Sequence, residues 1–454
     1  MPLRIVLVRH GQSSFNLEQR IQGRDDRSTL TEKGRHQARS AGHALADLTL
    51  DAVYSSPLSR ASDTATLLLG EHGSAVPPQI DDGLLEIDLA PWSGLLRREL
   101  IDVDPEGERL WREAPEALEL KRADGSRYRP IQELMAQAEG FVDRLLRTHR
   151  DLITAPDDGG RQGSVLIVAH NGILRCLLLQ LLSLPASGFS RFRLANASIS
   201  ILNLSGRAIA GNRPEVQIES LNGSAHLGED PLPSRGPGSR IVLVRHGETD
   251  WNREGRFQGQ KDIPLNQRGI SQAHAAQRVL TKVTFNRAYT SSMSRPRQTA
   301  ETILADHPGV PLTSTDGLRE IGHGLWEGRL EREIAEGWPQ LLADWKRAPE
   351  TVQMPEGETL QNVWDRSLST WLAIVRSLDT DETALVVAHD AVNKTILCAL
   401  MGLNPADIWS VKQGNGGVTV IDYPDTAEGE PVIACLNLTH HLGGVLDCTS
   451  PGAL

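Results

Sequence analysis

Unbroken aliphatic runs recur along the chain, without the alternation of polar residues that marks a half-exposed strand. They are Ile5–Val8, Val165–Ala169, Ile241–Val244 and Ala384–Ala388. Runs of this kind predict strands that are buried on both faces of a parallel sheet. The second and fourth runs are each followed by an apolar stretch, Ile173–Leu182 and Val392–Met401, which we predict to be helical.

Two further segments, Thr31–Leu48 and Asn266–Leu280, carry apolar residues at helical spacing. Thr31 suits an N-cap, and Glu32 supplies the acidic residue expected in a first turn. Strands that alternate with helices favour an α/β fold with a mostly parallel sheet. We therefore predict a three-layer α/β/α architecture.

The same order of segments occurs twice. The stretch IVLVRHGQSSFN at 5–16 corresponds to IVLVRHGETDWN at 241–252, and VLIVAHNGI at 165–173 corresponds to ALVVAHDAV at 384–392. The offset between the copies falls from 236 (246 − 10) through 234 (320 − 86) to 219 (389 − 170). The main length difference therefore lies between 117 and 165 of the first copy, where the segment 153–163, with its Pro, Gly and Asp residues, favours a loop.

A segment rich in Pro, Gly and Ser separates the copies and is typical of a linker. We predict a first domain at 1–228, a linker at 229–239 and a second domain at 240–448. The length of 454 residues leaves room for two domains of ordinary size.

The formal net charge is −11, which argues against a nucleic-acid partner and means that the chain as a whole repels anions. Any anionic substrate therefore needs a local cluster of arginines. No stretch approaches the ~18 apolar residues of a membrane span, and the N-terminal apolar run ends at Arg9, as in a strand rather than a signal peptide. The four cysteines form no paired motif, so we expect a cytoplasmic protein without a membrane partner.

The residues with the strongest chemistry follow the predicted strands. Arg9-His10 and His170 stand at strand ends in the first copy, and Arg245-His246 and His389 in the second. Ligands of open α/β sheets gather at the carboxyl ends of strands. Arginine carries a permanent charge and a fork of donors that suits phosphate, and a neutral imidazole can attack phosphorus and later leave. The sequence thus favours phosphoryl chemistry.

Two copies of Arg-His-Gly, each followed by a Ser-x-x-Ser-Arg motif, a Glu-Ile before Trp-x-Gly and an Ala-His after a strand, resemble the histidine phosphatase superfamily, also called phosphoglycerate mutase-like. The resemblance covers nearly the whole chain, twice, and implies that fold for both domains. The catalytic residues it implies are His10, Glu86, His170, His246, Glu320 and His389. The phosphate-binding residues it implies are Arg9, Asn16, Arg60, Arg245, Asn252 and Arg295, and a substrate-side loop would contain Gln22, Gly23, Gln258 and Gly259.

In this scheme His10 and His246 are the nucleophiles, Glu86 and Glu320 are the general acids, and His170 and His389 contact the phosphate as cations. Two assignments have structural alternatives. Asn16 and Asn252 also suit a turn or a cap, and an acid of the first copy, Asp88, could take the role of Glu86.

The resemblance implies no cofactor and no metal site, and no P-loop or HExxH pattern occurs. The copies depart from the family pattern in places. The first has Gln12-Ser13 where the family often has Glu-Thr, and the second has Asp390-Ala391 after its second histidine. An acid beside a phosphate pocket weakens anion binding.

The tandem layout, the stretch AHDAVNKTIL and the ending CLNLTHHL resemble double-domain phosphatases related to 2-carboxy-D-arabinitol-1-phosphate phosphatase. We predict a metal-independent phosphomonoester hydrolase that acts on a small anionic metabolite, a sugar phosphate such as 2-carboxyarabinitol 1-phosphate, through a phosphohistidine. Two alternatives stay open: phosphoglycerate mutase-type transfer, or one catalytic and one ligand-sensing domain. The expected partner is a small phosphorylated metabolite, and the sequence leaves a homo-oligomer open.

Overall fold

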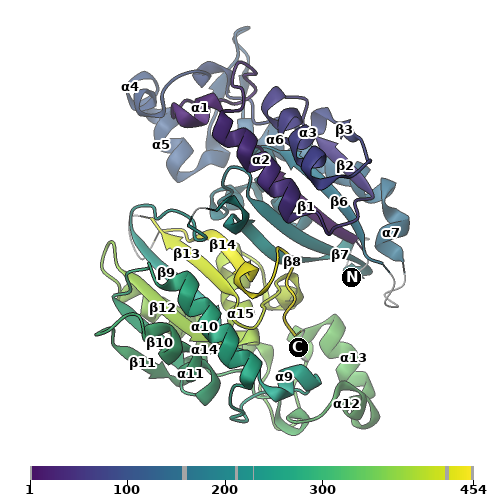
Figure 1. The fold of residues 1–454 in the computed structure, drawn as a ribbon, viewed down its shortest axis with the longest axis vertical. Coiled ribbons are helices and arrows are strands. Elements are labelled where there is room, and N and C mark those ends of the chain that lie inside the picture. The colour runs from purple at the N-terminus through teal and green to yellow at the C-terminus, as the bar shows by residue number, and fades with distance from the viewer. Residues whose placement is uncertain (1–2, 156–160, 210–212, 229, 425–428, 451–454) are drawn as a thin grey trace. The chain divides into compact units, whose positions relative to one another are not determined.

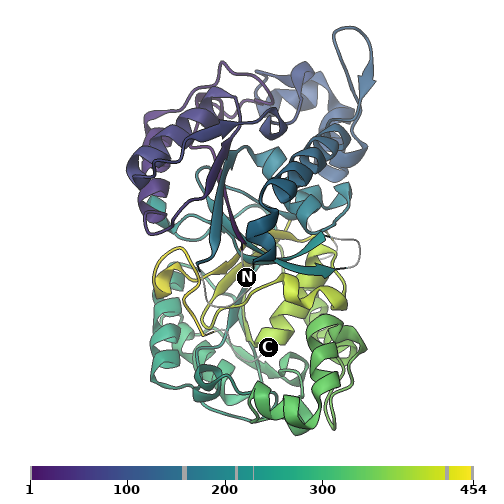
Figure 2. The same cartoon turned by 90° about the vertical axis from the view of Figure 1, so that its right-hand side faces the viewer.

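The computed structural model describes residues 3–155, 161–209, 213–228, 230–424 and 429–450, and it divides the chain into two compact units (Figures 1 and 2). The first unit is Met1–Pro231 and the second is Leu232–Leu454. Each unit is described by itself. Within the described residues, no helix is both long and apolar enough to cross a membrane.

The first unit contains a sheet of six strands in the order β8-β7-β1-β6-β2-β3. The strands are β1 (Leu3–Arg9), β2 (Ala52–Ser55), β3 (Pro78–Ile80), β6 (Gly163–Ala169), β7 (Ile199–Ile209) and β8 (Arg213–Gly223). The strands β1, β6, β2 and β3 pair in parallel. β7 pairs antiparallel with β1, and β8 pairs antiparallel with β7. Arg9 pairs with Ala169, so β1 and β6 end level with each other.

Helices cover both faces of this sheet, as the edge-on view in Figure 2 shows. The long helices are α2 (Glu32–Ala44), α3 (Ser59–His72), α6 (Pro130–Thr148) and α8 (Asn171–Leu181). α2 packs against α3, and α6 packs against α8. Shorter helices are α1 (Ser14–Leu17), α4 (Leu100–Val103), α5 (Pro105–Glu113) and α7 (Arg150–Thr154).

The second unit repeats this plan with the strand order β11-β10-β12-β9-β13-β14. The strands are β9 (Ser239–Arg245), β10 (Arg287–Ser291), β11 (Leu312–Thr315), β12 (Thr383–Ala388), β13 (Val418–Tyr423) and β14 (Val432–Leu438). The helices are α9 (Asp250–Glu254), α10 (Gln267–Leu280), α11 (Ser294–Leu304), α12 (Glu331–Gly337), α13 (Pro339–Arg347), α14 (Leu360–Arg376) and α15 (Asp390–Met401). Arg245 pairs with Ala388, so β9 and β12 also end level.

The predicted fold class is confirmed, and the aliphatic runs account for it. Every residue of β6 and β12 is buried, as expected for strands covered on both faces. The helix predicted over Thr31–Leu48 is shorter than expected, because it ends at Ala44 and the chain continues in turns until Leu48. Thr31 is its N-cap and accepts a hydrogen bond from the backbone N–H of Gly34 at 3.0 Å.

The extra length of the first copy is divided between two places. One part forms a short hairpin of β4 (Leu120–Lys121) and β5 (Arg127–Tyr128), and another forms α7. The loop predicted at 153–163 is helical at its start and joins β6 at Gly163, while its residues 156–160 lie outside the described residues.

A close crossing of two backbones fixes the turn that follows β1. A Cβ atom on Gly34 would lie 2.0 Å from the carbonyl oxygen of Gln12, and one on Gly11 would lie 2.3 Å from that of Gly34. Gly247 and Gly269 repeat the crossing in the second unit, with corresponding separations of 2.3 Å from Gly269 O and 2.1 Å from Glu248 O. Glycine is required at these four positions because no side chain fits between the backbones.

We expect Gly34→Ala to destabilise the first unit by about 1–3 kcal/mol, since its Cβ must force the turn off α2. Gly70→Ala is the matched control, because a Cβ at Gly70 in α3 meets nothing within 4 Å and alanine favours a helix by up to about 1 kcal/mol. Urea unfolding of both variants measures the difference. Equal stability of the two variants would contradict the crossing as a constraint.

Candidate active site

Two histidines meet in each unit just beyond the level ends of the central strands. The ring centroids of His10 and His170 lie 5.1 Å apart, and those of His246 and His389 also lie 5.1 Å apart. All four rings are buried. Strand register brings them together, because each pair follows two residues that are partners in the ladder, Arg9 with Ala169 in the first unit.

The hydrogen bonds of the first histidine of each pair fix its tautomer. Nδ1 of His10 lies 2.7 Å from the carbonyl oxygen of Gly11, and Nδ1 of His246 lies 2.7 Å from that of Gly247. A carbonyl oxygen only accepts, so Nδ1 carries the proton and Nε2 keeps its lone pair. In the second unit Nε of Arg295 donates to Nε2 of His246 at 3.2 Å, which agrees with this tautomer. Nε2 is therefore the atom able to attack an electrophile.

Two arginines surround each of these histidines. Arg60 and Arg295 come from the start of α3 and α11, and both are 1% exposed. Their terminal nitrogens donate to backbone carbonyls of the loop after the first short helix: Arg60 to Gly23 at 2.8 Å, and Arg295 to Gly259 at 2.8 Å. Nε of Arg60 is buried without a hydrogen-bond partner.

The other arginine of each pair ends the first strand. Arg9 donates from Nη1 to the carbonyl of Leu194 at 2.7 Å, and Arg245 donates from Nη1 to that of Gln413. Nε of both side chains is buried and unpartnered. Because a buried donor without a partner is costly, these atoms are ready to bind an anion beside the imidazoles.

Burial and the nearby arginines lower the pKa of all four imidazoles well below the usual value. This lowered pKa favours the neutral form of His170 and His389, whereas the sequence led us to expect them as cations in contact with phosphate. Nε2 of His170 lies 2.8 Å from Oγ of Ser56, while its Nδ1 is buried without a partner. His389 and Ser291 repeat this contact at 2.9 Å.

The predicted acids lie at the N-terminus of the helix that follows the second histidine. Glu86 accepts hydrogen bonds from the backbone N–H groups of Gly172 (3.1 Å), Ile173 (3.2 Å) and Ile87 (2.8 Å). Glu320 accepts from Ile321 at 3.0 Å and from Ala391 at 3.4 Å. The partly positive end of the helix favours a carboxylate there, so both side chains are fixed next to the histidine pair.

Burial, followed by the nearby charge of Asp390, raises the pKa of Glu320. Asp390 is 2% exposed, and its Oδ1 lies 3.5 Å from Nη1 of Arg245. A raised pKa keeps more of the carboxyl group protonated near neutral pH, which is the form that donates a proton.

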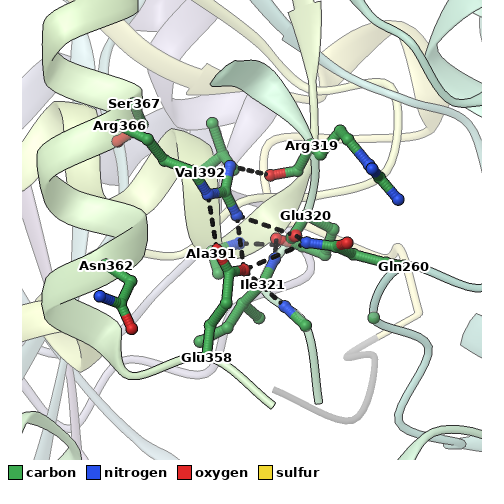
Figure 3. A network of polar contacts seen from close by, with 12 residues as sticks. Gln260, Arg319, Glu320, Ile321, Glu358, Asn362, Arg366, Ser367, Ala391 and Val392 are labelled. Carbon is green, nitrogen blue, oxygen red and sulfur yellow. Dashed lines mark hydrogen bonds and ion pairs between the residues drawn. The ribbon is translucent and has the colours of Figure 1, made fainter. Parts of the chain in front are cut away.

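A polar network holds the backbone of Glu320 in place (Figure 3). Arg366 of α14 donates to the carbonyls of Gly317, Arg319 and Glu320 at 3.2, 2.5 and 3.0 Å. The same guanidinium binds both carboxylate oxygens of Glu358 at 2.8 Å. Gln260 adds a second donor to the carbonyl of Glu320 at 3.0 Å, so three side chains fix the loop that carries the acid.

The first unit holds the equivalent loop with the two residue types exchanged. Arg24, at the position of Gln260, donates to the carbonyl of Glu86 at 2.9 Å. Gln137, on α6 where Arg366 stands on α14, donates to the carbonyls of Gly83 and Leu85 at 3.2 and 2.8 Å. Sequence reasoning missed this support, because Arg and Gln swap places between the copies and leave no repeated motif.

Asn16 and Asn252 complete capping boxes at the start of α1 and α9, where Ser13 and Thr249 are the N-cap residues. Oδ1 of Asn16 accepts from the backbone N–H of Ser13 at 3.2 Å, and Oδ1 of Asn252 accepts from Thr249 at 3.1 Å. Further asparagines, Asn196 and Asn415, donate to the carbonyls of His10 and His246 and to these same Oδ1 atoms. Capping uses only the oxygen of Asn16 and Asn252, so the amide nitrogen remains available as a donor.

The substrate-side loop lies next to this cap. Oε1 of Gln22 accepts from Oγ of Ser13 at 3.0 Å, and Oε1 of Gln258 accepts from Oγ1 of Thr249 at 2.9 Å. Nε2 of Gln258 is buried without a partner. Gly23 and Gly259 have positive φ angles of 52° and 56°, which turn their carbonyls toward Arg60 and Arg295.

A pocket in the second unit collects most of the predicted residues. Its lining is Arg245, His246, Asn252, Arg256, Phe257, Gln258, Gly259, Arg295, Glu320 and His323. His323 was not predicted from the sequence, because Leu89 stands at its position in the first copy. Burial lowers the pKa of His323 to about 3, so the pocket wall presents a neutral imidazole.

Among the described residues, no group of three or more His, Cys, Asp or Glu side chains is arranged to hold a metal ion. The charged groups around the histidine pairs are arginines and one carboxyl group in the first unit, and arginines, Glu320 and Asp390 in the second. Arginines bind phosphate oxygens by paired hydrogen bonds, so the chemistry of both sites fits an oxyanion.

Comparison with known proteins points the same way. A model of the histidine phosphatase superfamily (branch 1) matches residues 5–214 and 241–439. A 2-carboxy-D-arabinitol-1-phosphatase of Triticum aestivum is 30% identical over 453 residues, 97% of this chain and 86% of the relative. Phosphoserine phosphatase 1 of Hydrogenobacter thermophilus is 34% identical over 45% of this chain and 94% of its own length. The solved structure of Bacillus stearothermophilus YhfR, 31% identical, covers 45% of this chain and 99% of its own with a TM-score of 0.42.

We expect Arg366→Met to lower kcat for phosphate release by the second unit about ten-fold or more, since Glu320 loses the donor that fixes its loop. The measurement uses a His10→Ala background, and the loss should be larger for alkyl than for activated aryl phosphates. Arg297→Met is the matched control, because Arg297 is exposed and pairs only with Glu301 in the contacts of its own helix. Equal rates in the two variants would show that the network does not position the acid.

Proposed function

Since the chain belongs to the histidine phosphatase superfamily and is a phosphatase, we propose that it hydrolyses a small anionic sugar phosphate, such as 2-carboxyarabinitol 1-phosphate, and that a phosphohistidine forms in each unit during turnover. One observation carries the proposal. In each unit an imidazole whose Nε2 carries the lone pair lies beside a buried arginine Nε that has no hydrogen-bond partner. This arrangement combines a nucleophile with a receptor for a phosphoryl group.

In the first half-reaction, Nε2 of His10 or His246 attacks phosphorus, and the bond from phosphorus to the ester oxygen breaks. The arginines stabilise the negative charge on the three equatorial oxygens. Glu86 or Glu320 gives its proton to the leaving alkoxide. The products are the free alcohol, a phosphohistidine and a carboxylate.

In the second half-reaction, that carboxylate takes a proton from water as the water oxygen attacks phosphorus. The N–P bond breaks, Nε2 regains its lone pair, and inorganic phosphate leaves. His170 and His389 lie 5.1 Å from the nucleophilic rings and face the same phosphoryl group. The arginines supply the positive charge that a metal ion provides in other phosphatases, so the proposal needs no cofactor.

The substrate class draws on two kinds of support. The wheat relative, whose name specifies a carboxylated sugar phosphate, aligns with both units rather than with one. Both sites also gather arginines against a net charge of −11, as an anionic metabolite requires. We favour a phosphatase over a mutase because the relative that aligns with both units is named a phosphatase.

One observation favours the alternative that the second unit senses a ligand instead of turning it over. Asp390 lies 3.5 Å from Arg245 and 2.8 Å from Lys394, so part of the positive charge of the second site is already neutralised. A carboxylate at this place weakens the attraction for phosphate. The test of function therefore treats the two units separately.

We expect the wild type to release phosphate from sugar phosphates in the presence of a chelator, with slower isomerisation of 3-phosphoglycerate than hydrolysis of the best substrate. His10→Ala and His246→Ala should each keep one active unit, and the double variant should lose turnover. Label from substrate should be trapped on the two histidine peptides after rapid quenching. A double variant with wild-type turnover would disprove the mechanism, and activity that needs an added divalent ion would contradict its metal independence.

We expect Glu86→Gln and Glu320→Gln to slow hydrolysis by about 100-fold for alkyl phosphates, whose leaving groups need a proton, and by much less for activated aryl phosphates. Each variant is measured in the background that silences the other unit. The raised pKa of Glu320 also predicts the direction of the pH dependence. The activity of the second unit should fall as pH rises through that pKa, because only the protonated acid donates a proton. Equal losses for both substrate types would remove these residues from the acid role.

A further inference from the structure

Arg175 is a cation of the first unit whose guanidinium forms no ion pair among the described residues. It lies on α8, and its guanidinium lies over the ring of Phe189 at 5.1 Å from the centroid. Nε is buried without a hydrogen-bond partner, and within the described residues the guanidinium makes neither a hydrogen bond nor an ion pair. The side chain is partly exposed, and it lies within one turn of Gly172 on α8, whose backbone N–H binds the acid Glu86.

The groups that act electrostatically on Arg175 include the acid Glu86 of the site, besides Cys176, Arg193 and Arg97. Glu86 favours its charge, while Arg97 opposes it, and Arg175 in turn opposes the charge of Arg9. Burial lowers the pKa of Arg175 to about 10. The carboxylate of Glu86 is already bound by three backbone N–H groups. Within the described residues, neither Arg175 nor the exposed Arg97 forms an ion pair, so both charges remain available to a substrate anion.

The second unit places a cation in the same position but pairs it internally. Lys394 stands at the position that corresponds to Arg175, and its Nζ lies over the ring of Trp409 at 5.2 Å from the centroid. Its Nζ lies 2.8 Å from Oδ2 of Asp390, where the first unit has Asn171. Glu331, paired with Lys346, stands in place of Arg97. The two sites therefore share their phosphoryl-transfer residues and differ in charge beside them.

We propose that Arg175, with Arg97 at the rim, binds a carboxylate of the substrate in the first unit, and that the second unit accepts phosphomonoesters with a neutral group at that place. The proposal rests on the proposed function and deepens it, because it assigns different substrate classes to the two sites. A guanidinium forms paired hydrogen bonds to a carboxylate. Asp390 prevents carboxylate binding at this place in the second unit, because it forms an ion pair with Lys394 and its own charge repels a substrate carboxylate.

The test compares two substrates that differ only in this group. 3-Phosphoglycerate carries a carboxylate where glycerol 3-phosphate carries a hydroxymethyl group. In a His246→Ala background, Arg175→Gln should lower kcat/KM for 3-phosphoglycerate about ten-fold or more, mainly through KM, because it removes a charge-assisted hydrogen bond. The rate with glycerol 3-phosphate should change less than about two-fold, which also shows that the variant folds.

Two further variants sharpen the test. Arg175→Lys should restore part of the preference for the carboxylate, and Arg112→Gln, an exposed charge control on α5, should leave both substrates unaffected. In a His10→Ala background, Asp390→Asn should raise the ratio of kcat/KM for 3-phosphoglycerate over glycerol 3-phosphate. This ratio is independent of any change in the acid Glu320 that affects both substrates alike.

An equal loss for both substrates in Arg175→Gln, or no loss for either, would overturn the proposal for the first unit. An unchanged ratio in Asp390→Asn would overturn it for the second. Failure of the proposed function has a different signature: the wild type and the double nucleophile variant would release phosphate equally slowly from every phosphomonoester.

Discussion

Burial of arginines whose Nε has no hydrogen-bond partner is the constraint on which both sites depend. Nε of Arg9, Arg60 and Arg245 is buried and unpartnered, and burial lowers the pKa of Arg9 to about 10. Such groups cost stability unless the surrounding structure holds them rigidly. The parallel strands, the glycine crossing after β1 and the carbonyls that accept from the terminal nitrogens provide this rigidity. The free energy spent on unpaired donors is regained when a phosphoryl group binds them.

The elements that place the histidines could be predicted from the sequence because their signals are local. An aliphatic run followed by Arg-His or Ala-His specifies both a buried strand and the side chain at its carboxyl end. The register Arg9 to Ala169 then follows from parallel pairing of two such runs. Residues whose role is fixed by their own segment, such as Thr31 as an N-cap, were predicted for the same reason.

The residues that support the acid could not be predicted, because their contacts join distant segments without a periodic signal. Arg366 reaches carbonyls 46 to 49 residues away, and its counterpart in the first unit is Gln137. The protonation of the imidazoles could not be predicted either. Composition gives their number, whereas only the packing shows that burial and the neighbouring arginines both lower the pKa of His170 and His389. His323 could not be predicted from the repeat, because the first copy has Leu89 at the corresponding position.

Duplication explains how the two sites can differ in charge while they keep the same chemistry. Each unit places its histidines with its own buried strands, so a substitution beside one site leaves the strand residues of the other unit unchanged. The change from Asn171 to Asp390 illustrates this freedom. It adds a buried negative charge, which Lys394 compensates at 2.8 Å within one turn of the same helix, and it raises the pKa of the neighbouring acid Glu320. In the proposed mechanism this one substitution therefore acts on both anion binding and proton transfer in the second unit, while His246 keeps the same hydrogen bond that His10 makes.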